Sequence, residues 1–192
     1  MTGLDPAVDE LVEVAVVITD YDLNPIDEGF HIVIKPSDKA FAQMSDFVRG
    51  MHTTSGLLHE IAGGIALQEA ETQILSYIRQ FVPEPQSAPL AGNTIGTDRA
   101  FIQKYLPTVH EHLHYRNIDV STIKELSKQW YPKAYFQSPE KNGGHRALAD
   151  IRESIRELAY YRRAVFVEGP GFETSVLKAL STEITDHWSS RL

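Results

Sequence analysis

Runs of apolar residues predict two strands near the beginning of the chain. Residues 11–19, LVEVAVVIT, are mostly β-branched and nearly continuous, which is typical of a buried strand. Residues 30–35, FHIVIK, alternate between apolar and polar positions and end at Pro36. The turn-forming segment 20–25, DYDLNP, lies between them, so a hairpin is the simplest connection.

Apolar residues at helical spacing predict long helices over residues 65–82 and within 143–162, and a last amphipathic segment over 176–188. We also expect helices around Phe101 and over 121–130, where Thr122 and Glu125 have the spacing of a capping box. Short strands are predicted around Leu90 and over 115–120, and the Pro-, Gly- and Asn-rich segment 131–144 predicts a loop. Residues 37–55 give no clear pattern. This order predicts an α/β fold, a mixed sheet flanked by helices.

Composition narrows the class of protein. The chain has 192 residues, 42% hydrophobic and 23% charged, which suits one globular domain with a short appendage. It has no cysteine, and its first 15 residues are acidic and unlike a signal peptide. The net charge of −8 argues against a broad nucleic-acid groove. A short nucleic acid held by metal ions stays compatible with that charge.

The segment 143–162, GGHRALADIRESIRELAYYR, carries the first candidate chemistry. Asp150 lies beside the apolar stripe of the predicted helix, and His145 precedes the first turn next to Gly144. A carboxylate near an imidazole suits general-base chemistry at a metal site. The ordinary alternative is a surface histidine before a helix whose dipole favours an acidic first turn, and the segment alone slightly favours that alternative.

Three histidines, His110, His112 and His114, alternate along the chain. On a strand all three would share a face and could bind zinc, whereas on a helix only His110 and His114 would. No fourth ligand is obvious nearby. The sequence therefore favours exposed histidines on a short helix after Pro107.

Four motifs together give a specific resemblance: MTGLDP at Met1, GNTIGTDRAF at Gly92, HYRNIDVSTIKEL at His114 and HRALADIRES at His145. In order and spacing they resemble the oligoribonuclease family, in the histidine subtype of the DEDD class of 3′–5′ exonucleases. The likeness runs from residue 1 to about Arg163. It implies a ribonuclease H-like exonuclease domain over residues 1–163, followed by a tail over 164–192 with a helix.

The resemblance implies two divalent ions, Mg²⁺ or Mn²⁺, held by four acidic residues. Carried over by motif, Asp98 and Asp150 are the third and fourth metal ligands and His145 is the general base. The family's first motif is a strand with Asp-x-Glu directly before Met-Thr-Gly-Leu, which here are residues 1–4. Two carboxylates and their strand are therefore missing from this sequence. Either the start is assigned at an internal methionine, which the intact remaining motifs favour, or the chain is a catalytically impaired relative.

Substrate-binding residues carry over by the same motifs. Leu4 and Phe47 resemble a wedge that stacks on the bases of a dinucleotide, with core packing as the alternative for Phe47. Thr94, Arg116, Ser121 and His52 resemble a cap around the 5′ phosphate, with a surface ion pair as the alternative for Arg116. Tyr115 matches an active-site tyrosine that reaches in from the second subunit of a homodimer, with a core position as the alternative.

The expected function is a cytoplasmic, homodimeric 3′-to-5′ exoribonuclease that degrades short RNA, especially dinucleotides, to mononucleotides. The cap explains the length preference, because two nucleotides fit between the cap and the metal ions while a longer chain collides with the cap. A short-RNA-binding relative with impaired catalysis and a DNA-directed exonuclease of the same class are the alternatives.

Overall fold

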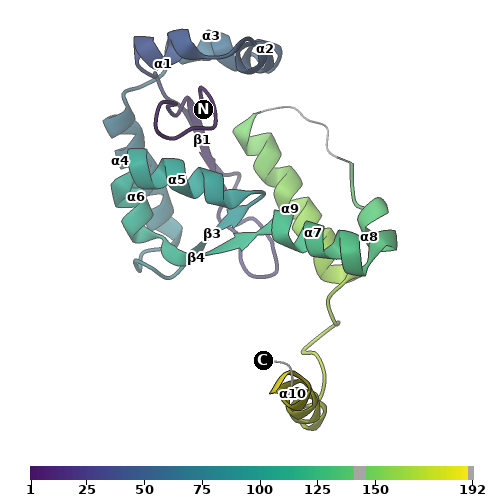
Figure 1. The fold of residues 1–192 in the computed structure, drawn as a ribbon. Coiled ribbons are helices and arrows are strands. Elements are labelled where there is room, and N and C mark those ends of the chain that lie inside the picture. Colours follow the sequence, from purple (N-terminus) through teal and green to yellow (C-terminus); the bar gives the residue numbers. More distant parts are fainter. Residues whose placement is uncertain (141–145, 190–192) are drawn as a thin grey trace.

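The computed structural model describes residues 1–140 and 146–189, and it shows short strands with helices on both sides (Figure 1). Strands β1 (Glu13–Val16) and β2 (Phe30–Val33) pair antiparallel, with Val14 opposite Ile32. Strands β3 (Pro89–Gly92) and β4 (His114–Asp119) pair parallel. The predicted α/β class and the predicted hairpin are confirmed. Within the described residues, the strands form two separate two-stranded sheets rather than one continuous sheet.

The first strand is shorter than the predicted range 11–19. Regular pairing covers Glu13–Val16, but hydrogen bonds continue past both ends. The Ile34 amide donates to the Val12 carbonyl over 2.9 Å, and the Ile26 amide donates to Ile18 over 2.9 Å. The predicted range is therefore extended chain whose outer parts do not form a regular ladder.

Ten helices lie in the described ranges, and their bounds are α1 (Asp38–Gln43), α2 (Asp46–Thr54), α3 (Leu57–Ile61), α4 (Leu67–Phe81), α5 (Ile95–Tyr105), α6 (Pro107–His112), α7 (Val120–Trp130), α8 (Pro132–Phe136), α9 (Ala147–Ala164) and α10 (Thr174–Ser189). Figure 1 shows α4, α5 and α6 on one side of the strands and α7 and α9 on the other, with α1–α3 across one end.

The main core lies between α4, the α5–α6 pair and the β1–β2 hairpin. Helix α4 buries one face, as its apolar spacing predicts. That face contributes Ala70, Ile74, Tyr77 and Ile78 to a cluster completed by Leu11, Ile32, Ile34, Phe101, Leu106 and Val109. The Tyr77 hydroxyl donates to Asp27 over 2.7 Å, which satisfies the one polar atom of this side chain.

Two regions differ from the sequence-based expectations. Segment 37–55, which gives no clear pattern, forms α1 and α2, each begun by a serine N-cap, Ser37 and Ser45. The predicted loop 131–144 contains α8, so that part of the prediction is wrong. Pro132 occupies the first turn of α8, where its missing N–H costs nothing. Residues 141–145, including His145, lie outside the described residues.

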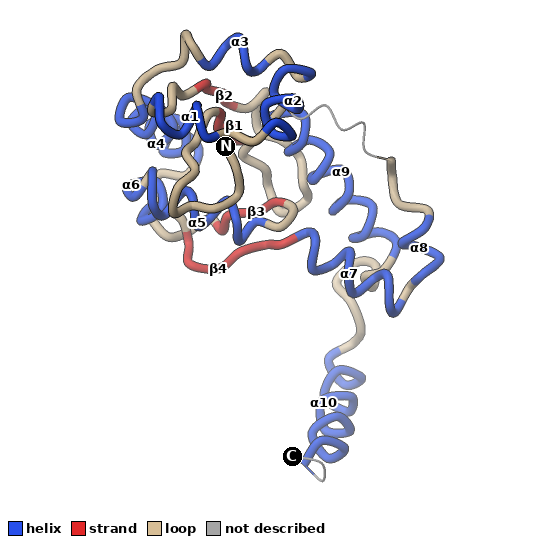
Figure 2. Tube along the Cα trace, turned by 45° about the horizontal axis from the view of Figure 1, so that its top comes forward, coloured by secondary structure: helices blue, strands red, loops and turns tan. Residues whose placement is uncertain are grey.

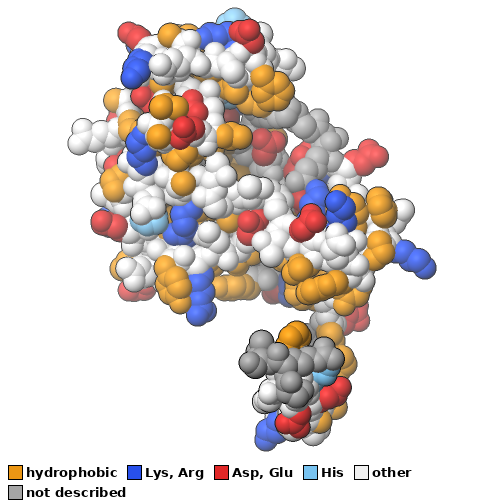
Figure 3. All heavy atoms as spheres, viewed as in Figure 1, with side chains coloured by type: hydrophobic (Ala, Val, Ile, Leu, Met, Phe, Trp, Pro, Cys, Tyr) orange, Lys and Arg blue, Asp and Glu red, His pale blue; other side chains and the backbone are white. Residues whose placement is uncertain are grey.

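The tail forms the predicted helix, α10, but buries none of its described residues. Both views place α10 away from the rest of the molecule (Figures 1 and 2), and Figure 3 shows apolar atoms along it. From its amphipathic pattern this helix is expected to pack on the domain or on a partner chain. Residues 174–189 are not buried against the domain, so packing on a partner chain and the division after residue 163 stay predictions. A search of the described residues finds no helix long and apolar enough to cross a membrane.

Candidate active site

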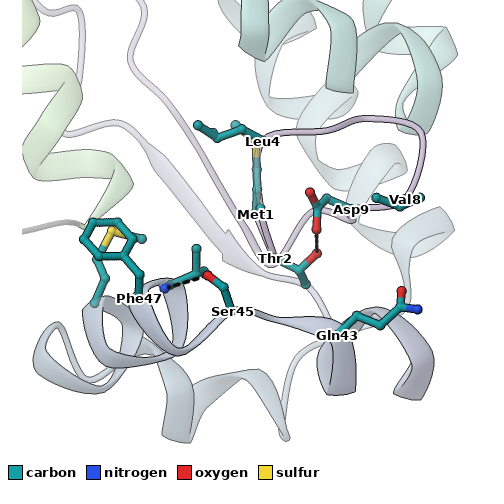
Figure 4. Close-up of a pocket in the computed structure, with 11 residues that line it drawn as sticks. Met1, Thr2, Leu4, Val8, Asp9, Gln43, Ser45 and Phe47 are labelled. Carbon is teal, nitrogen blue, oxygen red and sulfur yellow. Dashed lines mark hydrogen bonds between the residues drawn. The ribbon is translucent and has the colours of Figure 1, made fainter.

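A cavity of about 780 Å³ lies between the N-terminal segment and helices α1 and α2 (Figure 4). Leu4 and Phe47 line it from opposite walls and are strongly exposed, at 76% and 82%. Core packing is therefore wrong for Phe47. The cavity is otherwise mostly apolar, with Met1, Val8, Val48 and Met51 among its lining residues.

Short-range hydrogen bonds hold both walls of this cavity. The Thr2 hydroxyl donates to Asp9 over 2.9 Å, and the Asp5 amide donates to the same carboxylate over 2.9 Å. These bonds fold residues 2–9 into a tight loop with Leu4 at its rim (Figure 4). On the other wall, the Ser45 hydroxyl accepts from the Val48 amide and caps α2, which fixes Phe47 in the first turn.

Asp98 lies in the first turn of α5 and is partly buried. Burial raises the pKa of its carboxyl, while the positive Met1 amino group lowers it by a smaller amount. Burial also lowers the pKa of that amino group to about 6, against the attraction of Glu13, Asp98 and Asp9. Asp98 thus lies in a poorly solvated position, where a nearby cation stabilises the charged form of its carboxyl.

Asp150 lies in the first turn of α9, and its backbone amide donates to the Arg146 carbonyl over 3.0 Å. Two hydrogen bonds connect this turn to the segment that leads into α5. The Asn93 side-chain amide donates to Ser154 over 2.8 Å, and the Ser154 hydroxyl donates to the Asp150 carbonyl over 2.9 Å. One hydrogen bond therefore joins Asn93, two residues before α5, to α9 one turn beyond Asp150.

These two aspartates fit a hard divalent cation. Such ions take oxygen ligands and commonly use one or two protein carboxylates together with phosphate oxygens and water. A desolvated carboxylate such as Asp98 gains most from the positive charge. Within residues 1–140 and 146–189, no group of three or more His, Asp or Glu side chains is arranged to hold a metal ion.

Thr94 and Ser121 come together where β3 meets α5 and β4 meets α7. The Thr94 amide lies 2.9 Å from the Ser121 hydroxyl oxygen and 3.0 Å from Asp119, and the two hydroxyl groups are 3.2 Å apart. Thr94 has a left-handed backbone, with φ of 53°, which orients its amide toward these acceptors. The structure thus brings together two of the predicted cap residues, although their role stays a prediction.

Arg116 and Tyr115 are both exposed on β4. A core position for Tyr115 is wrong, because 73% of the residue is accessible. In the described part of the chain, the Arg116 guanidinium lies 5.4 Å from the centre of the Tyr115 ring, which is a cation–π contact rather than an ion pair.

His52 lies on α2 and is buried, with Nε2 at 2.9 Å from the Met1 carbonyl oxygen. It supports the N-terminal wall of the cavity, and its role in the cap stays a prediction. The expectation of three exposed histidines on a short helix is wrong. His112 is buried with Nε2 at 2.8 Å from the Val82 carbonyl oxygen, His110 and His114 are half-buried, and His114 lies on β4 instead of α6.

Two supporting residues escape sequence-based assignment. Arg99 follows Asp98 and donates to Asn117 over 2.6 Å and to the His114 carbonyl over 2.8 Å, so it ties α5 to β4. Glu13 accepts from the Ala147 amide at the start of α9 over 3.1 Å. A signal for Glu13 was available, because it is the one charged residue in the apolar run LVEVAVVIT. Its partners lie too far along the chain to be inferred.

Comparison with known proteins gives a consistent result. The RNase_T family model, described as Exonuclease, matches residues 1–158. A protein named Oligoribonuclease from Leifsonia xyli subsp. xyli is 62% identical over 192 residues, which cover 100% of this chain and 93% of that protein. Another with the same name, from Streptomyces coelicolor, is 55% identical over 95% of this chain and 92% of its own length.

A solved structure of Exonuclease I from Methylocaldum szegediense superposes with a TM-score of 0.65. The two sequences are 20% identical, and the match covers 85% of this chain and 39% of the other. At that identity the likeness concerns the fold alone.

Proposed function

The chain belongs to the exonuclease family of the RNase_T type, and we propose that it is a 3′-to-5′ exoribonuclease that degrades short oligoribonucleotides, especially dinucleotides, to mononucleotides. The observation that carries the proposal is identity above 50% with proteins named Oligoribonuclease over nearly the whole chain. The exposed apolar pair at the cavity supports it, because bases of any sequence stack on such side chains.

In this proposal Asp98 and Asp150 hold divalent ions, Mg²⁺ or Mn²⁺. When bound, two such ions would supply Lewis acidity to a water molecule and to the scissile phosphate. His145 accepts the proton of the attacking water. Burial of Asp98 supports its proposed role as a metal ligand, since its carboxyl is partly desolvated and favours a cation.

Substrate binding divides between two regions. Leu4 and Phe47 stack on the bases, while Thr94, Arg116 and Ser121 bind the 5′ end, supported by the exposed guanidinium and the N-terminus of α7. His52 also belongs to this cap in the proposal, and its Nε2 lies 2.9 Å from the Met1 carbonyl oxygen at the N-terminal wall of the cavity. Tyr115 reaches the active site of a second subunit in a cytoplasmic homodimer, which its exposure on β4 permits.

The test is hydrolysis of a 5′-labelled RNA dinucleotide with Mn²⁺, compared with a longer RNA and with a primed DNA of the same sequence. We expect release of mononucleotide, fastest from the dinucleotide. Faster digestion of the primed DNA would point to a DNA-directed exonuclease. Dinucleotide binding that persists in EDTA, without turnover in Mn²⁺, would identify a binding protein instead.

A further inference from the structure

Helix α9 begins without a cap of its own. Its N-cap residue, Arg146, makes no side-chain hydrogen bond to the first turn. The carboxylate of Glu13 on β1 takes that place and accepts from the Ala147 amide over 3.1 Å. A negative charge at this position also suits the positive end of the helix dipole. A residue 134 positions away therefore caps the helix that carries Asp150.

Arg146 strengthens this contact from the other side. Its Nε donates to Glu13 over 2.9 Å, while Nη1 and Nη2 donate to the two carboxylate oxygens of Glu60 over 2.7 and 2.9 Å. The fork of the guanidinium matches a carboxylate in this two-bond geometry. His31 on β2 adds a contact of 2.7 Å to Glu13. We call Glu13, His31, Glu60 and Arg146 the α9 clamp.

The clamp is partly shielded from water, which makes it stronger than an exposed pair. The Glu13 side chain is 6% exposed and that of Arg146 is 29% exposed. Its parts come from β1, β2, α3 and the start of α9, so it fixes the first turn of α9 against three other elements. The pair at the opposite end of α9, Arg162 with Asp22, is 2.8 Å long but 51% and 72% exposed.

We propose that Arg146 is a positioning residue for the metal site, acting through the first turn of α9 on Asp150. The Asp150 amide hydrogen-bonds to the Arg146 carbonyl over 3.0 Å, so the clamp locates the backbone that carries this carboxylate. This inference rests on the proposed function, because it requires Asp150 to bind a divalent ion. Partners that orient metal ligands contribute strongly to metal affinity although they do not contact the ion.

The test compares Arg146→Met with Arg162→Met, which removes an ion pair from the other end of the same helix. We expect Arg146→Met to bind Mn²⁺ about tenfold more weakly or worse in calorimetric titration. Its kcat for dinucleotide falls while KM stays near the wild-type value, since Leu4 and Phe47 are untouched. Arg146→Lys keeps the positive charge but cannot make the two-bond contact with Glu60. We expect its Mn²⁺ affinity and its kcat to lie between those of Arg146→Met and those of the wild type. Arg162→Met matches the wild type in both measurements.

A folded Arg146→Met protein that binds Mn²⁺ as tightly as the wild type would overturn the inference. If that variant does not fold, Glu60→Gln replaces it, because Glu60 is 44% exposed and the Glu13 contact remains. For Glu60→Gln we expect a smaller loss of Mn²⁺ affinity than for Arg146→Met. An unchanged Mn²⁺ affinity in Glu60→Gln would overturn the inference. Wild-type protein that binds Mn²⁺ but hydrolyses no dinucleotide refutes the proposed function alone. Wild-type protein that binds no Mn²⁺ refutes both.

Discussion

Leu4 and Phe47 show what the structure adds at the scale of single residues. From the sequence, Phe47 is equally compatible with a core position and with a surface wedge. Its exposure beside a cavity decides for the surface, and Leu4 lies on the opposite wall. The sequence cannot give this result, because an apolar residue in a segment without clear periodicity carries no sign of which way it faces.

We expect Leu4→Ala and Phe47→Ala to raise KM for an RNA dinucleotide while changing kcat little. Stacking of a base on an aromatic side chain contributes about 1–3 kcal/mol, so Phe47→Ala raises KM roughly fivefold to 150-fold, and Leu4→Ala, which removes no aromatic ring, raises KM less. Phe136→Ala is the matched control, because Phe136 is 74% exposed and does not line the cavity. Equal KM values for Phe47→Ala and Phe136→Ala would contradict the wedge.

The pKa of Asp98 gives a second prediction at this scale. Burial raises the pKa of this carboxyl, so the folded protein holds the proton more tightly than the unfolded chain does. Ionisation therefore destabilises the metal-free fold as the pH rises above the ordinary range of a carboxyl group. We expect Asp98→Asn to raise the melting temperature at pH 7 in EDTA.

At about pH 3, where the carboxyl is protonated in both states, that gain disappears. Addition of Mn²⁺ at pH 7 then stabilises the wild type more than Asp98→Asn. Melting curves by calorimetry with and without Mn²⁺ measure both effects. If Asp98→Asn is less stable than the wild type in EDTA at pH 7, burial of the ionised Asp98 carboxyl does not destabilise the fold.

At the scale of elements, periodicity predicts the long helices well and the strands less well. Helix α4 lies within two residues of its predicted range at each end, because fifteen residues give the apolar stripe several repeats. The four-residue strands offer too few repeats to fix their ends. The sequence does not predict α8, because five residues are too few to show an apolar face at helical spacing. Proline in an unassigned segment also favours a loop, although it is compatible with the first turn of a helix.

Helices α7 and α9 are joined by an ion pair that can be tested directly. Glu157 on α9 is 2% exposed, and its carboxylate lies 3.0 Å from the Lys124 amino group on α7. Lys124→Met removes the cation and leaves a buried carboxylate with less compensation, so we expect a loss of about 1–3 kcal/mol in the free energy of unfolding. Lys39→Met, an exposed position on α1, is the control. Urea denaturation of both proteins measures the difference, and equal stabilities would argue against this pair.

At the scale of the whole molecule, the likeness of motifs identifies the exonuclease domain, and the family match over residues 1–158 agrees with it. The position of α10 cannot be predicted from the sequence. An amphipathic pattern predicts a helix with an apolar face, but it does not identify the surface on which that face packs.

The proposed homodimer predicts complementation between two inactive variants. Asp150→Ala loses a metal ligand, and Tyr115→Ala loses the side chain that enters the second subunit's site. In a mixed dimer one of the two sites has both residues intact, so unfolding and refolding an equal mixture restores roughly a quarter of wild-type activity. No recovery in a mixture that sedimentation shows to be dimeric would place Tyr115 in the site of its own subunit.

The contact between Glu13 and Ala147 has a consequence for the synthesis of this protein. It closes a loop of 134 residues, and contacts between such distant parts of a chain form late because much entropy must be lost first. A chain emerging from the ribosome presents Asp98 well before it can anchor Asp150. We therefore expect that an unfinished or prematurely terminated polypeptide cannot attack RNA, and that nuclease activity arises only when translation of the domain is nearly complete.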